Sequence, residues 1–277
     1  MHDYAVTENE IVLGFAEVSK FFGGLVALDG VSGEVFGGEI LGIIGPNGAG
    51  KTTLFNIISG VFSPSKGKIG LRGRPITGLP CHKIARLGMA RTFQNIRLFR
   101  EMTVLENVLL GRHSQGRAGL LSSVLRLPGM RREERRLRGE AFDYLDMVGL
   151  SDQAAAKAGN LATGQQRLLE IARALAGEPQ LILLDEPAAG LNTRETEALG
   201  EFILRMQQEL GLTIVLIEHD MHLLMDVAER VVVIDRGRKI AEGTPGQIQA
   251  DPRVISAYLG EEFGASDSPA QAGGGPG

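Results

Sequence analysis

Aromatic residues and cysteine are scarce in this chain. Its 277 residues include no tryptophan and one cysteine, and aromatic residues make up only 5%. The chain therefore has few aromatic side chains that could stack on the bases of single-stranded nucleic acid. Its net charge of −4 also provides no positive field to attract nucleic acid. Because Cys81 is the single cysteine, no internal disulfide can form, which fits a reducing cytosol.

Long apolar runs are also missing. The longest candidates, Thr213–Ile217 and Val231–Ile234, have the length of strands and fall well short of the roughly 18 apolar residues typical of a membrane helix. Residues 1–10 have neither the basic start nor the apolar stretch of a secretion signal. We therefore expect a chain that does not cross a membrane by itself, with enough apolar residues, 43%, for a substantial core.

A glycine-rich stretch matches the phosphate-binding pattern G-x-x-x-x-G-K-[ST]. It consists of Gly45, Pro46, Asn47, Gly48, Ala49, Gly50, Lys51, Thr52 and Thr53. Glycines let the backbone wrap around a triphosphate and aim N–H groups at it, and a helix that begins here points its positive dipole end at the phosphates. Lys51 can add a mobile cation for the β- and γ-phosphates, and the Thr52 hydroxyl can bind Mg²⁺.

The residues on either side favour this interpretation over a glycine-rich hairpin with an incidental Lys-Thr. Ile40–Ile44 is a short apolar run that predicts a buried strand. Residues 52–60 predict a helix that ends at Gly60. A strand, a glycine turn and a helix in this order are the context that a phosphate-binding loop requires.

A second apolar run ends in two carboxylates. Residues 181–184 predict a buried parallel strand, and Asp185 and Glu186 follow it directly. Ligands of α/β sheets collect at the carboxyl ends of the strands, so Asp185 could hold Mg²⁺ directly or through water, and Glu186 could polarise the attacking water. The alternative is that Asp-Glu-Pro only opens a loop, and the phosphate-binding stretch makes the catalytic interpretation the stronger one.

Two more strand-like runs end in polar residues that suit the same site. Residues 212–217 are followed by Glu218, His219 and Asp220. His219 could contact the γ-phosphate and orient the water, although a lone histidine is more often structural. Gln94 ends the run 89–93 and could bridge metal and water. An ordinary polar residue leaving a strand is a stronger alternative for Gln94 than for His219.

A second anion site is predicted where a helix over residues 164–176 begins. The residues at this point are Leu161, Ala162, Thr163, Gly164 and Gln165. Thr163 is expected to cap the helix, and a helix N-terminus with small residues can bind an anion. One chain needs only one site for a γ-phosphate. A second site therefore suggests that it binds the γ-phosphate of a nucleotide held by another chain.

The remaining pattern predicts an α/β domain with additions. Residues 11–36 suggest antiparallel strands, the second of them broken by Gly30 and Gly33, and residues 67–73 a further strand. Helices are expected at 80–87, and at 103–112, 120–127 and 131–148 within a helical insertion over about 95–160. The alternating pattern then resumes and closes with a short helix that ends at Leu259.

These elements set the expected boundaries. We expect an N-terminal extension over residues 1–10, one domain over 11–263, and a disordered tail over 264–277, which is rich in Gly, Pro, Ser and Ala. Between the first two strands lie Phe21 and Phe22, and one of these rings could stack on a flat adenine. Spacing alone favours burial of both rings in the core.

Taken together, these segments resemble the nucleotide-binding subunits of ABC transporters over about residues 11–260. On that resemblance, residues 45–53 are Walker A, 181–186 Walker B and 161–165 the signature segment. It implies a Q-loop role for Gln94, a switch-histidine role for His219 and adenine stacking for Phe22. It also implies ATP and Mg²⁺ as ligands, with Thr52, Gln94 and Asp185 at the metal and Lys51, Gln94, Glu186 and His219 in catalysis.

The fold implied by this resemblance is a P-loop NTPase core with an antiparallel β subdomain and an inserted α-helical subdomain. The chain departs from the family pattern at Ala162, where a serine is usual, at Thr163, where a glycine is usual, and at Asn192, where the D-loop segment 189–192 usually has an aspartate. We therefore expect the signature hydroxyl contact to be lost or shifted, and coupling across a dimer at Asn192 to be altered.

A narrower resemblance is to the ATPases of branched-chain amino-acid importers. The segments that carry it are 91–94, 98–104, 160–167, 185–192 and 257–260. It implies a head-to-tail pair of ATPases at the cytoplasmic face of the inner membrane, two permeases, an extracytoplasmic binding protein and no nucleic acid. Alternatives are a urea or lipopolysaccharide transporter, a soluble ABC ATPase acting on DNA or ribosomes, or a GTPase or P-loop kinase.

Overall fold

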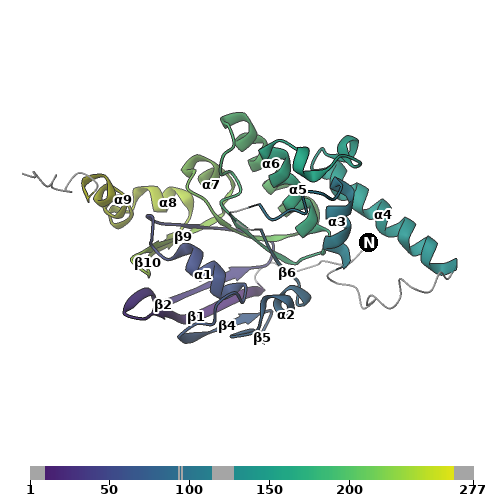
Figure 1. Cartoon of the computed structure of the whole chain (residues 1–277). Coiled ribbons are helices and arrows are strands. Elements are labelled where there is room, and N and C mark those ends of the chain that lie inside the picture. Colours follow the sequence, from purple (N-terminus) through teal and green to yellow (C-terminus); the bar gives the residue numbers. More distant parts are fainter. Residues whose placement is uncertain (1–9, 93, 95, 114–127, 265–277) are drawn as a thin grey trace, which may run out of the picture.

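A computed structural model describes residues 10–92, 94, 96–113 and 128–264 of the chain (Figure 1). The strands are β1 (Ile11–Phe22), β2 (Leu25–Phe36), β3 (Ile40–Ile44), β4 (Lys66–Leu71), β5 (Arg74–Pro75), β6 (Met89–Arg91), β7 (Leu181–Asp185), β8 (Thr213–Ile217), β9 (Arg230–Asp235) and β10 (Arg238–Gly243). The helices are α1 (Lys51–Ile58), α2 (Cys81–Arg86), α3 (Val104–His113), α4 (Pro128–Met147), α5 (Thr163–Leu175), α6 (Thr193–Leu210), α7 (Met221–Val227), α8 (Pro245–Ala250) and α9 (Pro252–Gly264).

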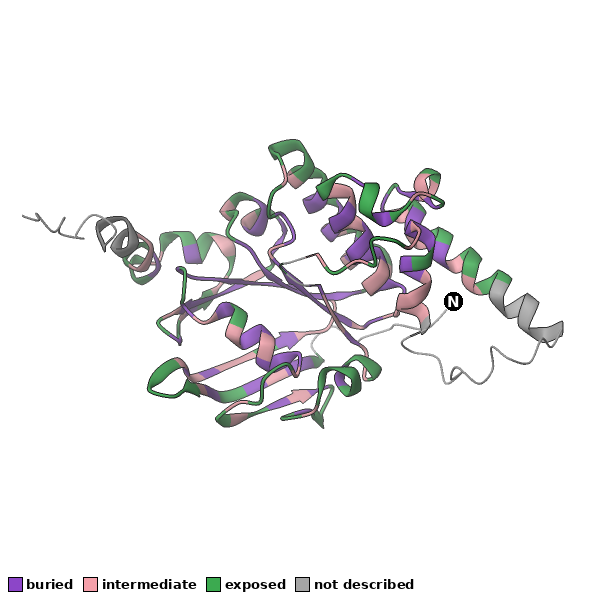
Figure 2. Ribbon diagram, in the orientation of Figure 1, coloured by how far each residue is buried: buried purple, intermediate pink, exposed green. Residues whose placement is uncertain are grey.

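The central layer is a six-stranded sheet in the order β10-β9-β3-β8-β7-β6. All neighbours from β9 to β6 pair in parallel, and β10 pairs antiparallel with β9. Every residue of β3, β7 and β8 is buried, because both faces of this sheet are covered (Figure 2). This is why these strands are continuous apolar runs in the sequence.

The two faces of the sheet belong to two apolar clusters. In β3, Ile40 and Ile44 pack with residues of α3 to α7, whereas Leu41 and Ile43 pack with α1 and the antiparallel strands. Alternate side chains of a strand point to opposite faces, so one short strand joins both clusters. The α/β class and the P-loop layout predicted from the sequence are confirmed.

A separate antiparallel sheet has the order β2-β1-β4-β5. The expectation that Gly30 and Gly33 would break β2 is wrong, because β2 continues from Leu25 to Phe36. Gly33 instead makes room for a neighbouring ring: a Cβ added there would lie 2.5 Å from Cζ of Phe15. Glycine in a strand therefore marks a close approach here rather than an end.

The helical part consists of α3, α4 and α5, which pack on one another at one side of the sheet (Figure 1). The predicted helix over 120–127 lies outside the described residues, as do residues 1–9 and 265–277 of the predicted extension and tail. Among the residues that the structure describes, no helix is long and apolar enough to cross a membrane.

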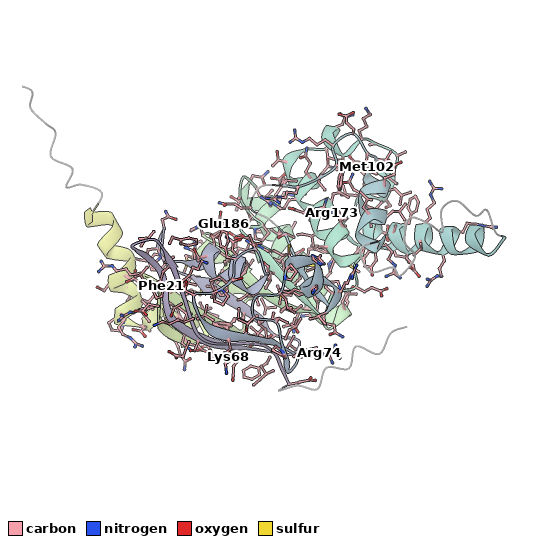
Figure 3. The ribbon with its side chains drawn as sticks, turned by 60° about the horizontal axis from the view of Figure 1, so that its bottom comes forward. Phe21, Lys68, Arg74, Met102, Arg173 and Glu186 are labelled. Atoms are coloured by element: carbon pink, nitrogen blue, oxygen red, sulfur yellow. The ribbon has the colours of Figure 1, made fainter. Side chains whose placement is uncertain are left out.

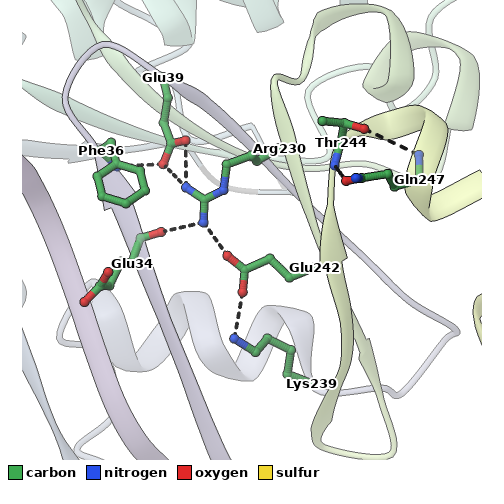
Figure 4. A network of polar contacts seen from close by, with 8 residues as sticks. All are labelled: Glu34, Phe36, Glu39, Arg230, Lys239, Glu242, Thr244 and Gln247. Carbon is green, nitrogen blue, oxygen red and sulfur yellow. Dashed lines mark hydrogen bonds and ion pairs between the residues drawn. The ribbon is translucent and has the colours of Figure 1, made fainter. Parts of the chain in front are cut away.

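Two helix expectations are wrong at the C-terminal side of the chain. Helix α7 is absent from the predicted elements; it begins at Met221 and is capped by Asp220, whose carboxylate accepts a hydrogen bond from the N–H of Leu223 at 3.1 Å. The single short helix expected to end at Leu259 is two helices, α8 and α9, and α9 extends to Gly264. Thr244 caps α8 in a reciprocal pair with Gln247, which separates α8 from β10 (Figure 4).

Arg230 ties the two sheets together (Figure 4). Its guanidinium donates to both carboxylate oxygens of Glu39, at 2.9 and 2.8 Å, and also pairs with Glu242 of β10. It lies 4.9 Å from the ring centroid of Phe36, at the end of β2. The Glu39 side chain is only 7% exposed, and burial raises the pKa of its carboxyl above the ordinary value of 4.5.

We predict that Arg230→Met lowers the free energy of unfolding by about 3 kcal/mol, because a buried carboxylate is left without its partner. Urea unfolding of the full chain at neutral pH measures this loss. Adding Glu39→Gln to the variant is expected to restore part of the loss, since it removes the buried charge. A double variant no more stable than Arg230→Met would contradict this explanation.

Candidate active site

The phosphate-binding stretch follows β3 directly and wraps tightly before α1 begins at Lys51. Gly45 has φ 152°, and a Cβ there would lie 1.9 Å from the carbonyl oxygen of Ile234. Gly50 has φ 108°, and a Cβ there would lie 2.6 Å from the carbonyl oxygen of Ala27. Both positions need glycine, because any side chain would collide with a neighbouring strand or turn.

Lys51 reaches back across the loop that it follows. Its ammonium donates to the carbonyl oxygens of Gly45 at 2.5 Å and of Pro46 at 3.0 Å. The lysine side chain is buried, whereas Asn47, Gly48 and Thr52 are exposed. The loop is therefore held around a cation, and its exposed rim and the first turn of α1 point N–H donors and a hydroxyl outward.

Asp185 ends β7 in a buried ion pair. Its Oδ2 accepts from Nη2 of Arg91 at 2.7 Å, and the two side chains are 2% and 6% exposed. Its Oδ1 is buried and has no hydrogen-bond partner among the described residues. An orphaned carboxylate oxygen at a strand end has the donor chemistry of a Mg²⁺ ligand.

Glu186 contacts two other predicted site residues, Gln94 and His219. Its Oε2 accepts from the Nε2 amide of Gln94 at 2.7 Å, and its Oε1 lies 2.8 Å from Nε2 of His219. The structure therefore brings Gln94, Glu186 and His219, which come from three different strand ends, into one hydrogen-bonded group. Figure 3 shows Glu186 between the helical part, which carries Met102 and Arg173, and the antiparallel sheet, which carries Lys68 and Arg74.

The backbone of Glu186 is strained. Its φ is 50°, in the left-handed region that glycine adopts most readily, and its N–H donates to the carbonyl of Ile217 at 2.9 Å. Residues held in such conformations cluster at functional sites, because the surrounding structure must enforce them. Here the neighbouring strand β8 enforces the turn that aims the Glu186 carboxylate back at His219.

Glu218 is a further residue of the site, to which the sequence pattern assigns no role. Its buried carboxylate accepts from the N–H of Ala188 at 2.6 Å and from the N–H of His219 at 3.1 Å. Burial raises the pKa of its carboxyl, and the nearby charge of Glu186 adds to this. Glu218 thus fixes the backbone on both sides of the Glu186–His219 contact. Its position directly after the apolar run 212–217 is the feature of the sequence that could have indicated this role.

The signature segment lies at the start of α5, in the helical part. The prediction that Thr163 caps this helix is wrong: Ala162 is the cap and Thr163 the first helical residue. Because alanine has no oxygen to offer, Gln165 takes over part of the capping and accepts from the N–H of Ala162 at 3.2 Å. Ala162 and Thr163 are exposed, Leu161 is buried, and Gly164 and Gln165 are half-buried, so the helix end is open to a ligand.

Phe22 lies at the end of β1 and is exposed. The alternative that Phe21 and Phe22 are both core residues is wrong, since 37% and 42% of their surfaces remain exposed. The ring of Phe22 meets Phe62 edge-to-face at 5.6 Å, and Nζ of Lys20 lies 5.1 Å from its centroid. Stacking on adenine stays a prediction for this exposed ring.

Comparison with known proteins decides the family. Residues 28–189 match the family model described as ABC transporter. The chain belongs to the ABC transporter family. Residues 238–264 match a second model, described as branched-chain amino acid ATP-binding cassette transporter. This second match covers β10, α8 and α9, the segment in which one helix is predicted and two are present.

Individual relatives agree with this assignment to the ABC family. The chain is 49% identical over 240 residues to the high-affinity branched-chain amino acid transport ATP-binding protein LivG of Escherichia coli, covering 87% of this chain and 94% of the relative. It is 47% identical over 250 residues to BraF of Pseudomonas aeruginosa, covering 90% and 98%.

Solved structures give the same result for the fold. A nucleotide-free ATP-binding cassette from an ABC transporter superposes with a TM-score of 0.78 at 34% identity, covering 90% of this chain and 98% of the other. A dimeric cassette in a post-hydrolysis state, bound to ADP and phosphate, superposes with a TM-score of 0.71 at 28% identity, covering 84% and 98%. The chain is thus an ABC ATPase, the nucleotide-hydrolysing part of a transporter.

Within the ABC cassette, Asn192 has a local role. Its side chain accepts from the N–H of Glu195 at 3.1 Å, and Glu195 returns a bond to the N–H of Asn192 at 3.0 Å. This reciprocal pair caps α6. Asparagine caps a helix about as well as aspartate, so the departure from the usual D-loop residue keeps the helix start intact.

We predict that Glu218→Gln changes the pH dependence of stability in a defined direction. The folded pKa of Glu218 is raised above its ordinary value of 4.5, so folding favours the protonated form. Its contribution to stability is then fully present below about pH 4.5 and is lost as pH rises through the raised pKa. The free energy of unfolding of the parent minus that of the variant should fall as pH rises across this window. Urea unfolding at several pH values measures it, and a difference that stays flat or rises would contradict the assignment.

Proposed function

We propose that this ABC ATPase powers an importer of branched-chain amino acids. The C-terminal match over residues 238–264 and the 49% identity to LivG support this substrate class over urea or lipopolysaccharide. The single observation that carries the proposal is the agreement of these two, because a family model of the C-terminal segment and a relative matched over most of the chain name the same substrate class. The amino acid itself would never touch this subunit.

The proposed chemistry uses Glu186 as the general base. Its carboxylate would take a proton from the water that attacks the γ-phosphate of ATP, while Gln94 and His219 hold the carboxylate and orient that water. Lys51 and the N–H groups of the loop 45–50 would stabilise the negative charge that builds on the phosphate oxygens. Support comes from the bonds of 2.7 and 2.8 Å that already hold the Glu186 carboxylate.

Mg²⁺ fits the residues that are present. Thr52 is exposed at the start of α1, and Asp185 has a buried oxygen without a partner among the described residues. Together with Gln94, these side chains offer the oxygen ligands that Mg²⁺ requires in addition to phosphate and water. When bound, the ion would supply positive charge to the phosphate oxygens during hydrolysis.

The functional unit is proposed to be a head-to-tail dimer of two such ATPases, identical or related. The exposed start of α5 at Ala162–Gln165 would cover the γ-phosphate held by the partner's loop, through its N–H groups and helix dipole. The dimeric cassette bound to ADP and phosphate supports this arrangement. Two permeases would contact the helical part from the cytoplasmic face of the inner membrane, and an extracytoplasmic binding protein would deliver the amino acid.

We predict that Glu186→Gln lowers the rate of ATP hydrolysis by about 10²–10⁴-fold, the range typical of a lost general base. ATP binding should persist, so a dimer should accumulate with ATP and Mg²⁺ and be seen by size-exclusion chromatography with light scattering. Glu178→Gln is the matched control, because Glu178 is also a left-handed residue but lies at the opposite edge of the sheet. Near-normal ATP turnover by the Glu186 variant would show that Glu186 is not the general base.

We predict that cells which depend on this chain take up labelled leucine, isoleucine or valine, and that Lys51→Ala abolishes this uptake because the γ-phosphate loses its cation. Uptake of labelled urea in the same cells is the comparison. Uptake of urea but not of leucine, with the same dependence on Lys51, would make urea the substrate in place of branched-chain amino acids. It would leave the assignment as a transporter ATPase intact.

A further inference from the structure

Arg91 is a buried cation that nothing in the proposed mechanism uses. Its side chain is 6% exposed and ends β6, next to β7 in the sheet. Its guanidinium makes three side-chain contacts through two nitrogens: Nη2 with Oδ2 of Asp185 at 2.7 Å, and Nη1 with Oδ1 of Asn56 at 2.8 Å and Oγ of Ser59 at 2.7 Å. It also lies 5.7 Å from the ring centroid of Phe55.

These contacts reach all three segments that supply the predicted metal ligands. Asn56 is one helical turn after Thr52 on α1, so the two side chains share a face of that helix. Asp185 is contacted directly. Arg91 itself is three residues before Gln94, where β6 leads into the Q-loop. One guanidinium therefore spans the elements that carry Thr52, Asp185 and Gln94.

The contact with Asp185 is made by one of its two oxygens. Arg91 takes Oδ2, and Oδ1 stays buried without a partner among the described residues. A guanidinium is planar and permanently charged, so its contact fixes the rotation of the Asp185 carboxylate, which is only 2% exposed. A single free oxygen in a fixed direction suits Mg²⁺, which demands near-ideal octahedral geometry.

We propose that Arg91 is a positioning residue for the metal: it holds Asp185 so that Oδ1 alone is offered to Mg²⁺, and it locks α1 and β6 to that carboxylate. The proposal rests on the proposed function, since it takes Asp185 as a ligand of the metal bound with ATP. Lysine could keep the charge at this position. It could not bridge Asn56, Ser59 and Asp185 at once, because its ammonium is a single point on a flexible stem.

The test separates metal binding from phosphate binding. Calorimetric titration of the full chain with a non-hydrolysable ATP analogue gives Kd in Mg²⁺ and in EDTA, and their ratio measures the coupling between metal and nucleotide. Arg91→Lys is expected to reduce this ratio about fivefold or more, within the usual range of such couplings. Its Kd in EDTA should match that of the parent, because the loop 45–50 is untouched.

Two further variants make the result decisive. Arg230→Lys is the matched control, since Arg230 also bridges several groups but belongs to the network around Glu39. It should leave the ratio unchanged. Asn56→Ala removes one hydrogen-bond partner of Arg91 and should lower the ratio less than Arg91→Lys does. If Arg91→Lys does not fold, Asn56→Ala serves as the test in its place.

An unchanged ratio in both Arg91→Lys and Asn56→Ala would overturn the proposal, as would an equal fall in Arg230→Lys. Failure of the parent to bind the analogue in either condition would instead overturn the proposed mechanism, in which the loop 45–50 and Lys51 bind ATP. The two failures are therefore distinguishable in one set of titrations.

Discussion

The parallel pairing of β3, β8, β7 and β6 is the constraint on which the site depends. Each of these strands ends at the same edge of the sheet, and each is followed by a group that the chemistry needs. The phosphate-binding loop follows β3, His219 follows β8, Glu186 follows β7 and Gln94 follows β6. The order of the strands, rather than any single loop, therefore brings together residues that are distant in the chain, such as Gln94 and Glu186, which are 92 positions apart.

Carboxylates that lie close together at one sheet edge repel one another, and each of them is held by different partners. Asp185 pairs with the guanidinium of Arg91 at 2.7 Å. Glu218 is held by backbone N–H groups, and burial raises the pKa of its carboxyl. Glu186 accepts from an amide and contacts an imidazole. The carboxylate proposed to react is thus held by side chains without a permanent charge, Gln94 and His219, rather than by a guanidinium.

Most of the core and of the site could be predicted from the sequence, for physical reasons. Buried parallel strands are apolar throughout, so the runs 181–184 and 212–217 are recognisable as strands, and the polar residues that follow them are natural site candidates. What could not be predicted depends on contacts between distant residues. Nothing local to Arg91 indicates that it meets Asp185, and nothing local to Phe22 indicates that its ring is exposed rather than buried. The cap of α5 was misplaced because Thr163 is the better capping residue on propensity, yet Ala162 occupies the position.

ATP binding at this sheet edge, through the loop 45–50 and Lys51, underlies every step of the proposed mechanism. Equilibrium dialysis of the full chain against ATP with magnesium present, beside the Lys51→Ala variant, measures this binding. The parent should retain ATP, and the variant should retain far less. If the parent retained no ATP, or if both retained equal amounts, the loop and Lys51 would not be the ATP-binding site.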